Sequence, residues 1–218
     1  YRADGSSEFA GTNKYRYFPS VGAKWVISNE DFLKDSRVFS NLALRATWGI
    51  TGSQEFAAGS AINQFSFGTY NSVFQSNVGN KNLKWEQTNQ YDFGLEFAIL
   101  NNRIHGTLDY YNKDKTQSLV QTTVIQPGPP ANEFINLPGH LIHKGLEFSL
   151  GATIVENKDF SWDLSFNIAS NKNMLKEFYA PGSKNALTIN TGQINGQGVS
   201  GTLGQVITNT QEVDEFFL

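Results

Sequence analysis

Three glycines near the end of the chain have the spacing of a phosphate-binding loop. Gly196, Gly198 and Gly201 match G-x-G-x-x-G, the pattern that lets a backbone approach a dinucleotide pyrophosphate. That chemistry requires a buried strand before the motif and a helix after it. Here Asn190–Asn195, with the sequence NTGQIN, precedes the motif and a Gly/Thr-rich stretch follows it. We therefore interpret the motif as loop sequence and expect no cofactor.

Two histidines, His140 and His143, invite a metal interpretation because imidazole is a common zinc ligand. A spacing of three places two side chains on the same face of a helix but on opposite sides of a strand. No third ligand is evident, and the chain has no cysteine. We expect no metal site, with His143 as a polar side chain on the wet side of a strand.

Charged residues recur at alternate positions of several segments, where paired carboxylates could act as general acid and base. The same pattern is what the water-filled or plug-filled interior of a membrane barrel requires. We favour the barrel interior and expect no enzyme. The charges on this face are Lys24, Arg45, Lys84, Glu86, Asp92, Glu96, Asp109, Glu147 and Asp163.

The composition excludes some protein classes. The net charge of −3 and the pI near 5.6 do not favour a nucleic-acid partner. No apolar run reaches the 18 residues that a membrane-spanning helix needs, whereas membrane-spanning strands carry no such run. Aromatic residues make up 13% of the chain at only 39% hydrophobic residues, which fits strands with one apolar and one polar face.

Alternation is longest on either side of Asn101 and Asn102, over residues 83–100 and 103–118. Asn tolerates the positive φ of a two-residue hairpin turn. Such a turn pairs Ile99 with Ile104, Phe97 with Gly106, Leu95 with Leu108 and Phe93 with Tyr110, so that one face is apolar throughout. We predict a long hairpin here.

Four further strands are predicted at 15–27, 42–51, 141–156 and 160–174. Parity places Ile27 opposite Leu42, and a three-residue loop at 157–159 joins the last pair. Long surface loops are expected at 1–14, 52–82, 119–140 and 176–218. Long loops on one side and short turns on the other are characteristic of outer-membrane barrels.

The length of the predicted strands also favours an outer-membrane barrel. A run of roughly 17 alternating residues spans on the order of 55 Å, about three times an ordinary strand. Trp25, Trp48, Trp85 and Trp162, with Tyr110, would form the aromatic girdles at the two membrane surfaces. The predicted fold class is all-β: residues 1–218 form part of one transmembrane antiparallel up-and-down β-barrel.

Five blocks, in this order, carry a family resemblance: YFPSVGAKWVIS at 17–28, LRATWGITGSQ at 44–54, NLKWEQT at 82–88, DYYNK at 109–113 and KGLEF at 144–148. The chain resembles the C-terminal half of the barrel of SusC/RagA-type TonB-dependent outer-membrane transporters of Bacteroidetes. The resemblance covers residues 1 to about 176.

This resemblance implies a barrel of about 22 strands with a plugged lumen, of which about six lie here and whose plug domain is absent from this chain. It also implies a Gram-negative outer-membrane, TonB-energised transporter of oligosaccharides or oligopeptides. A SusD-like surface lipoprotein would close over the barrel, and outer-membrane lipid would surround it. The alternatives are a passive, structural or secretion-related outer-membrane barrel, and a soluble β-rich surface protein.

The predicted 52–82 loop contains several aromatic residues. Phe65, Phe67, Tyr70 and Phe74 are our candidates for contacting a ligand or a partner, since rings stack on sugars and bury against protein lids. Packing of the loop against itself explains them equally well.

Overall fold

The computed structural model describes residues 1–126, 129–179, 189–194 and 202–207. Within these residues the structure is all-β apart from three short 3-10 turns, and it contains no helix long and apolar enough to cross a membrane. The strands are β1 Arg2–Gly5, β2 Tyr15–Phe18, β3 Ser20–Val26, β4 Phe39–Ser53, β5 Gln64–Phe67, β6 Val73–Val78, β7 Glu86–Ile99, β8 Ile104–Val124, β9 Ala131–Glu156, β10 Ser161–Lys176, β11 Ile189–Ile194 and β12 Thr202–Ile207. The 3-10 turns are η1 Gly11–Lys14, η2 Ile27–Asn29 and η3 Thr69–Asn71.

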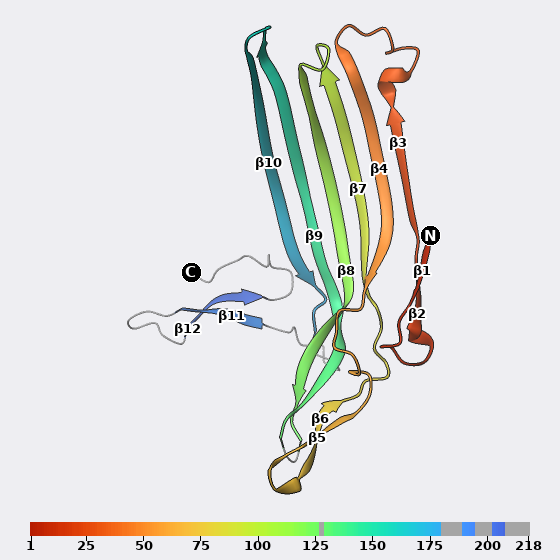
Figure 1. The fold of residues 1–218 in the computed structure, drawn as a ribbon, viewed down its shortest axis with the longest axis vertical. Coiled ribbons are helices and arrows are strands. Elements are labelled where there is room, and N and C mark those ends of the chain that lie inside the picture. Colours follow the sequence, from red (N-terminus) through yellow and green to blue (C-terminus); the bar gives the residue numbers. More distant parts are fainter. Residues whose placement is uncertain (127–128, 180–188, 195–201, 208–218) are drawn as a thin grey trace.

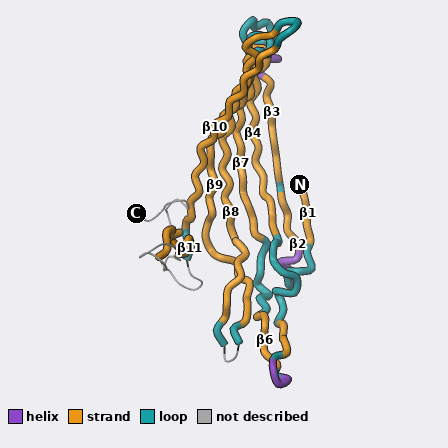
Figure 2. The backbone as a smooth tube through the Cα atoms, turned by 60° about the vertical axis from the view of Figure 1, so that its left-hand side comes forward, coloured by secondary structure: helices purple, strands orange, loops and turns teal. Residues whose placement is uncertain are grey.

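One eight-stranded sheet dominates the structure (Figure 1). Its six long strands run β3-β4-β7-β8-β9-β10, and each pairs antiparallel with the next. The sheet twists strongly along its length, and the short turns gather at one end and the loops at the other (Figure 2). The predicted all-β, up-and-down barrel architecture is confirmed for these strands.

The central hairpin has the predicted register. Ile99 pairs with Ile104, Phe97 with Gly106, Leu95 with Leu108 and Phe93 with Tyr110. The Arg103 backbone N–H donates to the Leu100 carbonyl at 3.3 Å, and Asn101 and Asn102 have φ of 57° and 67°. The turn residues thus fix which side chains share a face. We call the face of Trp25, Leu44, Leu95, Leu108 and Leu146 the apolar face, and the face of Lys24, Arg45, Glu96, Asp109 and Glu147 the polar face.

The other two connections at this end of the sheet differ in detail from the prediction. Trp25 pairs with Leu44, which is the predicted register, but β3 ends at Val26 and Ile27 enters η2, so that Ile27 and Leu42 do not pair. At 157–159 the Asn157 N–H donates to the Phe160 carbonyl at 2.8 Å, which makes a two-residue turn. A bulge then shifts the register between Trp162 and Asp163 and restores the expected pairing. The predicted three-residue loop was therefore wrong. The prediction that even-numbered residues of both strands share one face along most of their length was right.

The predicted loops contain more β-structure than expected. Residues 119–140 largely continue β8 and β9, because Pro129 and Pro130 fall between the two strands, where no ladder N–H is needed, and Pro127 lies outside the described residues. Pro138 adjoins an irregularity at Thr116/Ser118, where Gln117 and Gly139 adopt positive φ. Strands β1, β5 and β6, and β11 and β12, lie inside the predicted loops 1–14, 52–82 and 176–218.

Trp85 does not lie in a girdle, which corrects its predicted position. It is 5% exposed, stacks on Phe9 at 5.0 Å and meets Phe18 edge-on at 5.8 Å. Its indole N–H donates to the Asn13 carbonyl at 2.9 Å. The cluster of Phe9, Phe18, Ala61, Leu83 and Trp85 is the main core at the loop end. β7 begins only at Glu86, so Trp85 precedes the strand whose parity had assigned it to the apolar face.

The two faces of β7 predict unequal effects of neighbouring substitutions. Leu95→Arg should block barrel assembly, since an Arg on the lipid side at mid-membrane costs about 2–4 kcal/mol. Glu96→Gln should be mild, because the Lys24–Glu96 pair at 2.6 Å is solvent-accessible. The measurement is the fraction of heat-modifiable barrel in outer membranes. Equal losses in the two variants would show that the faces are misassigned.

Candidate functional site

The polar face contains one row of residues in register across the six long strands. Cross-strand register aligns Lys24 with Arg45, Arg45 with Gly94, Gly94 with Asp109, Asp109 with Glu147 and Glu147 with Ala169. Arg45 Nη2 donates to Asp109 Oδ1 at 2.7 Å, and it lies 3.2 Å from Asp92 Oδ1. One guanidinium from β4 thereby joins carboxylates of β7 and β8.

Gly94 makes this junction possible, because Arg45 must pass over β7 to reach β8. A Cβ on Gly94 would lie 2.5 Å from Asp109 Oδ1 and 3.2 Å from both Nε and Nη2 of Arg45. Nε of Arg45 is buried and has no hydrogen-bond partner within the described residues. The pair therefore depends on a missing side chain on the strand between its members. The sequence prediction named both charges but not this glycine.

Most other predicted charges of the polar face also find partners. Lys24 pairs with Glu96, Glu86 with Lys115 at 2.8 Å, and Asp163 accepts from Thr153 at 2.7 Å. Lys84 instead precedes β7, and its backbone bonds Asn136. Together the pairs form a polar wall rather than a pocket with converging carboxylates.

The histidines lie apart and have different partners. His140 Nδ1 lies 2.8 Å from Asp114 Oδ1 on the apolar face, whereas His143 Nδ1 lies 2.6 Å from Asn173 Oδ1 on the polar face. Within the described ranges, His, Asp and Glu form no group of three suited to a metal ion. The glycine motif at 196–201 lies outside the described residues.

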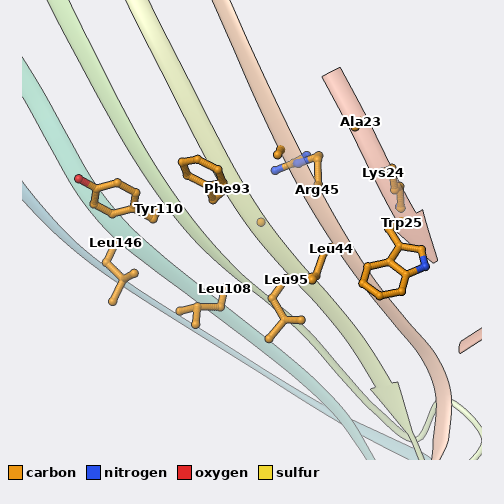
Figure 3. A pocket seen from close by; sticks show the side chains of 12 residues that line it. Ala23, Lys24, Trp25, Leu44, Arg45, Phe93, Leu95, Leu108, Tyr110 and Leu146 are labelled. Carbon is orange, nitrogen blue, oxygen red and sulfur yellow. The ribbon is translucent and has the colours of Figure 1, made fainter. Parts of the chain in front are cut away.

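A shallow groove of about 470 Å³ runs over the apolar face. Trp25, Phe93, Leu95, Tyr110 and Leu146 line it from β3, β7, β8 and β9 (Figure 3). It lies between ridges of side chains on an open sheet, and the predicted outward residues Trp25, Trp48, Trp162 and Tyr110 are all exposed on this face. Its chemistry suits lipid chains rather than a polar substrate.

The four predicted loop aromatics lie on the β5–η3–β6 hairpin at the loop end. Ser66 pairs with Phe74 and Phe67 with Val73, so Phe65 and Phe67 share one side and Phe74 takes the other. Phe67 is 85% and Tyr70 99% exposed, and Phe65 is also exposed, whereas Phe74 is half-buried. The hairpin thus presents three rings to solvent.

Polar anchors hold the base of this hairpin. Asn77 is buried, and its Nδ2 donates to the Ser60 and Ile62 carbonyls at 3.2 and 2.8 Å. Asn77 and Val78 pair with Asn132 and Glu133 of β9 as the only parallel pairing in the described sheet. Phe56, from the same loop, packs on Phe9 at 5.0 Å. The exposed rings are therefore carried on a secured base.

Comparisons with known proteins give a consistent family. The family profile described as "TonB dependent receptor-like, beta-barrel" matches residues 1–206. The TonB-dependent receptor SusC of Bacteroides thetaiotaomicron is 41% identical over 184 residues, which are 79% of this chain and 18% of SusC. The TonB-dependent receptor P3 of Formosa agariphila is 36% identical over 182 residues, covering 80% of this chain and 18% of P3. The chain thus spans less than a fifth of either relative.

Solved structures agree with these relatives. The RagAB peptide transporter superposes with a TM-score of 0.69 at 29% identity, over 80% of this chain and 20% of that chain. The RagAB peptide importer in its 'open-open' state gives a TM-score of 0.71 at 25% identity, over 94% of this chain and 21% of that chain.

The crossing at Gly94 predicts a site-specific loss of stability. Gly94→Ala should displace Asp109 or Arg45 and cost about 1–3 kcal/mol, as overpacking of a close-fitted site does. Gly22→Ala on the same face is the matched control, since the nearest atom to its added Cβ would be Thr47 Cγ2, at 3.3 Å. The denaturant midpoint of purified barrel measures both. Comparable midpoints for the two variants would contradict the role given to Gly94.

Proposed function

Because the chain belongs to the TonB-dependent receptor family of β-barrels, whose members are outer-membrane transporters and not enzymes, we propose that it forms wall strands of a TonB-energised uptake barrel. The observation that carries this proposal is the 41% identity to SusC over most of the chain. In this role the apolar face meets outer-membrane lipid and the polar face lines the lumen. The whole protein would span the outer membrane of a Gram-negative cell many times.

The polar wall supports the proposal that the lumen is filled by a plug domain and is not an enzyme active site. Its ion pairs satisfy one another across an intervening strand, as the Arg45–Asp109 contact does over β7 and the Lys24–Glu96 contact over β4. A wall of this kind leaves the selection of substrate to the plug and the loops. We therefore assign the transport gate to a plug domain outside this chain.

The proposed substrates are oligosaccharides or oligopeptides, taken up beneath a SusD-like surface lipoprotein. The peptide alternative is supported by the likeness to RagAB, which is described as a peptide transporter. Energy would come from the TonB complex acting through the N-terminal region of the whole protein. Fold-level likeness by itself does not select a ligand, so the two substrate classes are tested separately.

The β5–η3–β6 hairpin is our candidate for contact with ligand or lipoprotein. Phe65, Phe67 and Tyr70 are exposed at the loop end, where captured substrate or a lid would arrive. Phe74 packs close to Gly68 and would support the hairpin from its other side. Exposed aromatic rings are the side chains most enriched where proteins bind their partners.

Uptake by cells tests the transporter proposal. Deletion of the gene should abolish accumulation of a labelled oligosaccharide or of a labelled oligopeptide in a panel of both. Removal of TonB should have the same effect while the barrel remains assembled. Accumulation that persists without TonB would identify a passive barrel instead.

The exposed rings predict a binding defect without a folding defect. Phe67→Ala with Tyr70→Ala should change stability by less than about 0.5 kcal/mol, since both side chains are almost fully exposed. Binding of substrate or of the co-purifying lipoprotein should weaken about tenfold or more. Phe32→Ala with Phe160→Ala removes two exposed rings near the short turns and is the control. Unchanged binding in the hairpin variant would remove the hairpin from the site.

A further inference from the structure

A polar cleft of about 400 Å³ lies at the loop end of the sheet, between the η1–β2 segment and the residues at the start of β7. Gln87 of β7 and Thr116 of β8 line it and pair with each other across the ladder. Both residues share the parity of Leu95 and Leu108, so the cleft lies on the same side of the sheet as the apolar face. In the proposed membrane location this side is outside the barrel, and the cleft is separate from the lumen.

The cleft begins where the apolar band ends. On β7 the apolar face runs from Ile99 at the short turn to Tyr91, and beyond Tyr91 it continues with Asn89 and Gln87. Tyr91 is eight positions from Ile99 and Gln87 is twelve, about 27 and 41 Å of strand. At a tilt of ~40° these lengths are roughly 21 and 31 Å of height, against an apolar band of about 25 Å. The cleft therefore lies at the level of the lipid head groups, on the side of the long loops.

Aromatic side chains mark the border below the cleft. The Trp48 indole N–H donates to Asn89 Oδ1 at 2.8 Å, and Asn112 Nδ2 donates to the Tyr91 hydroxyl at 2.8 Å. At a membrane surface, Trp and Tyr keep their rings in the apolar layer and turn their polar atoms toward the head groups. The polar partners of these rings are thus the first polar side chains above the apolar band.

The cleft is cationic. Arg16 and Lys84 line it, and none of its lining residues is Asp or Glu. Neither cation forms an ion pair with a carboxylate within the described residues. Arg16 Nη2 donates to Gln87 Oε1 at 3.0 Å, which orients the guanidinium and uses one of its five N–H donors. An anionic group in the cleft would therefore meet two cations without displacing a carboxylate.

The walls of the cleft are held by contacts that do not involve the two cations. Asn13 Nδ2 donates to the Leu83 carbonyl at 3.0 Å, and the Asn13 carbonyl accepts from the Trp85 indole at 2.9 Å. Trp85 also meets the ring of Phe18, which lies over Gly52 where a side chain would leave no room. A site whose walls are already in place loses little conformational entropy when a ligand binds.

We propose that this cleft binds a saccharide that carries a carboxylate or phosphate group, presented at the head-group layer outside the barrel. Arg16 can donate two parallel N–H groups to such an anion, and Lys84 adds a second positive charge. The volume is in the range of small-molecule sites and exceeds what a lone anion needs. The Thr116 hydroxyl and the Gln87 amide suit sugar hydroxyls, and the Tyr15 ring, which lines the cleft and is 72% exposed, can pack on a sugar ring.

Two sources offer this chemistry: a membrane glycolipid with an acidic sugar head group, and a soluble acidic saccharide. Either ligand approaches the face opposite to the Arg45–Asp109 row, so the site is distinct from the uptake path. The inference rests on the proposed membrane location and goes beyond the proposed function.

The test uses the full-length protein in uncharged detergent, with glucuronosyl diacylglycerol as the probe and glucosyl diacylglycerol of the same chains as its uncharged counterpart. The apparent Kd is measured by calorimetric titration. The glucuronosyl lipid should bind about 25-fold more tightly than the glucosyl lipid, on the order of fivefold for each cation that meets its carboxylate. Methyl glucuronide, titrated in the same way, identifies the source. A Kd at least tenfold weaker than that of the glucuronosyl lipid would assign the cleft to glycolipids, and an equal Kd would assign it to soluble acidic saccharides.

Arg16→Gln with Lys84→Gln should raise the Kd of the glucuronosyl lipid about 25-fold and leave that of the glucosyl lipid unchanged. Both side chains belong to exposed residues, so the variant should assemble normally, which heat-modifiability checks. Lys81→Gln with Lys158→Gln removes the same charge from exposed residues outside the cleft and should leave both Kd values unchanged.

Equal Kd values for the two lipids, an unaltered Kd in the Arg16/Lys84 variant, or an equal loss in the control would each overturn the inference. Uptake of labelled substrate is measured on the same proteins, so that the two proposals are judged separately. Charge-dependent lipid binding without TonB-dependent uptake would contradict the proposed function alone. Normal uptake without charge-dependent binding would overturn the saccharide site alone.

Discussion

The pairing of backbone groups between neighbouring strands is the constraint on which the rest of this structure depends. In a membrane each strand must satisfy its N–H and C=O groups through the strands beside it. Once β7 and β8 are joined by the turn at Asn101 and Asn102, every later side chain is assigned to one of two faces by its position along the ladder. The polar row through Arg45 and the apolar groove through Leu95 follow from the same register. They lie on opposite faces of one hydrogen-bonded sheet.

Departures from that ladder occur where the chain changes environment. The bulge at Trp162/Asp163 lies beside a short turn, and the irregularity at Thr116/Ser118 lies where β8 and β9 pass from the long sheet toward the loop end. Gln117 and Gly139, at positive φ, form the second of these together with Pro138. Beyond it the two strands extend to Val124 and Ala131, and β9 pairs with β6, which connects the wall to the aromatic hairpin.

The sequence was sufficient for the long strands and insufficient at their ends. Alternation and turn chemistry gave the register of Phe93 with Tyr110, because period-two patterning and a two-residue turn leave one solution. Trp85 was misplaced because parity was extended one residue beyond the strand into a segment held by Phe9 and Asn13, about seventy positions away. The continuation of β8 and β9 was missed because this stretch carries four prolines, yet Pro129 and Pro130 precede β9 at the tip and Pro138 is accommodated within β9 beside the irregularity at Thr116/Ser118. Gly94 was passed over because its function depends on Arg45 and Asp109 two strands apart, which no local pattern reveals.

The outer strands of the sheet explain why so short a segment of the family needs the rest of the barrel. β3 and β10 each have one unpaired edge in the described sheet, and β10 is open to solvent along most of its length. Such edges cannot persist in lipid, where each unpaired group costs several kcal/mol. Since the chain spans 18% of SusC, strands from the remainder must cover both edges in the whole barrel. Closing the sheet into a barrel adds hydrogen bonds at its two edges and does not change which side chains lie on which face. The Arg45 row therefore stays on the polar face, and Lys144 and Lys172 stay on the apolar face.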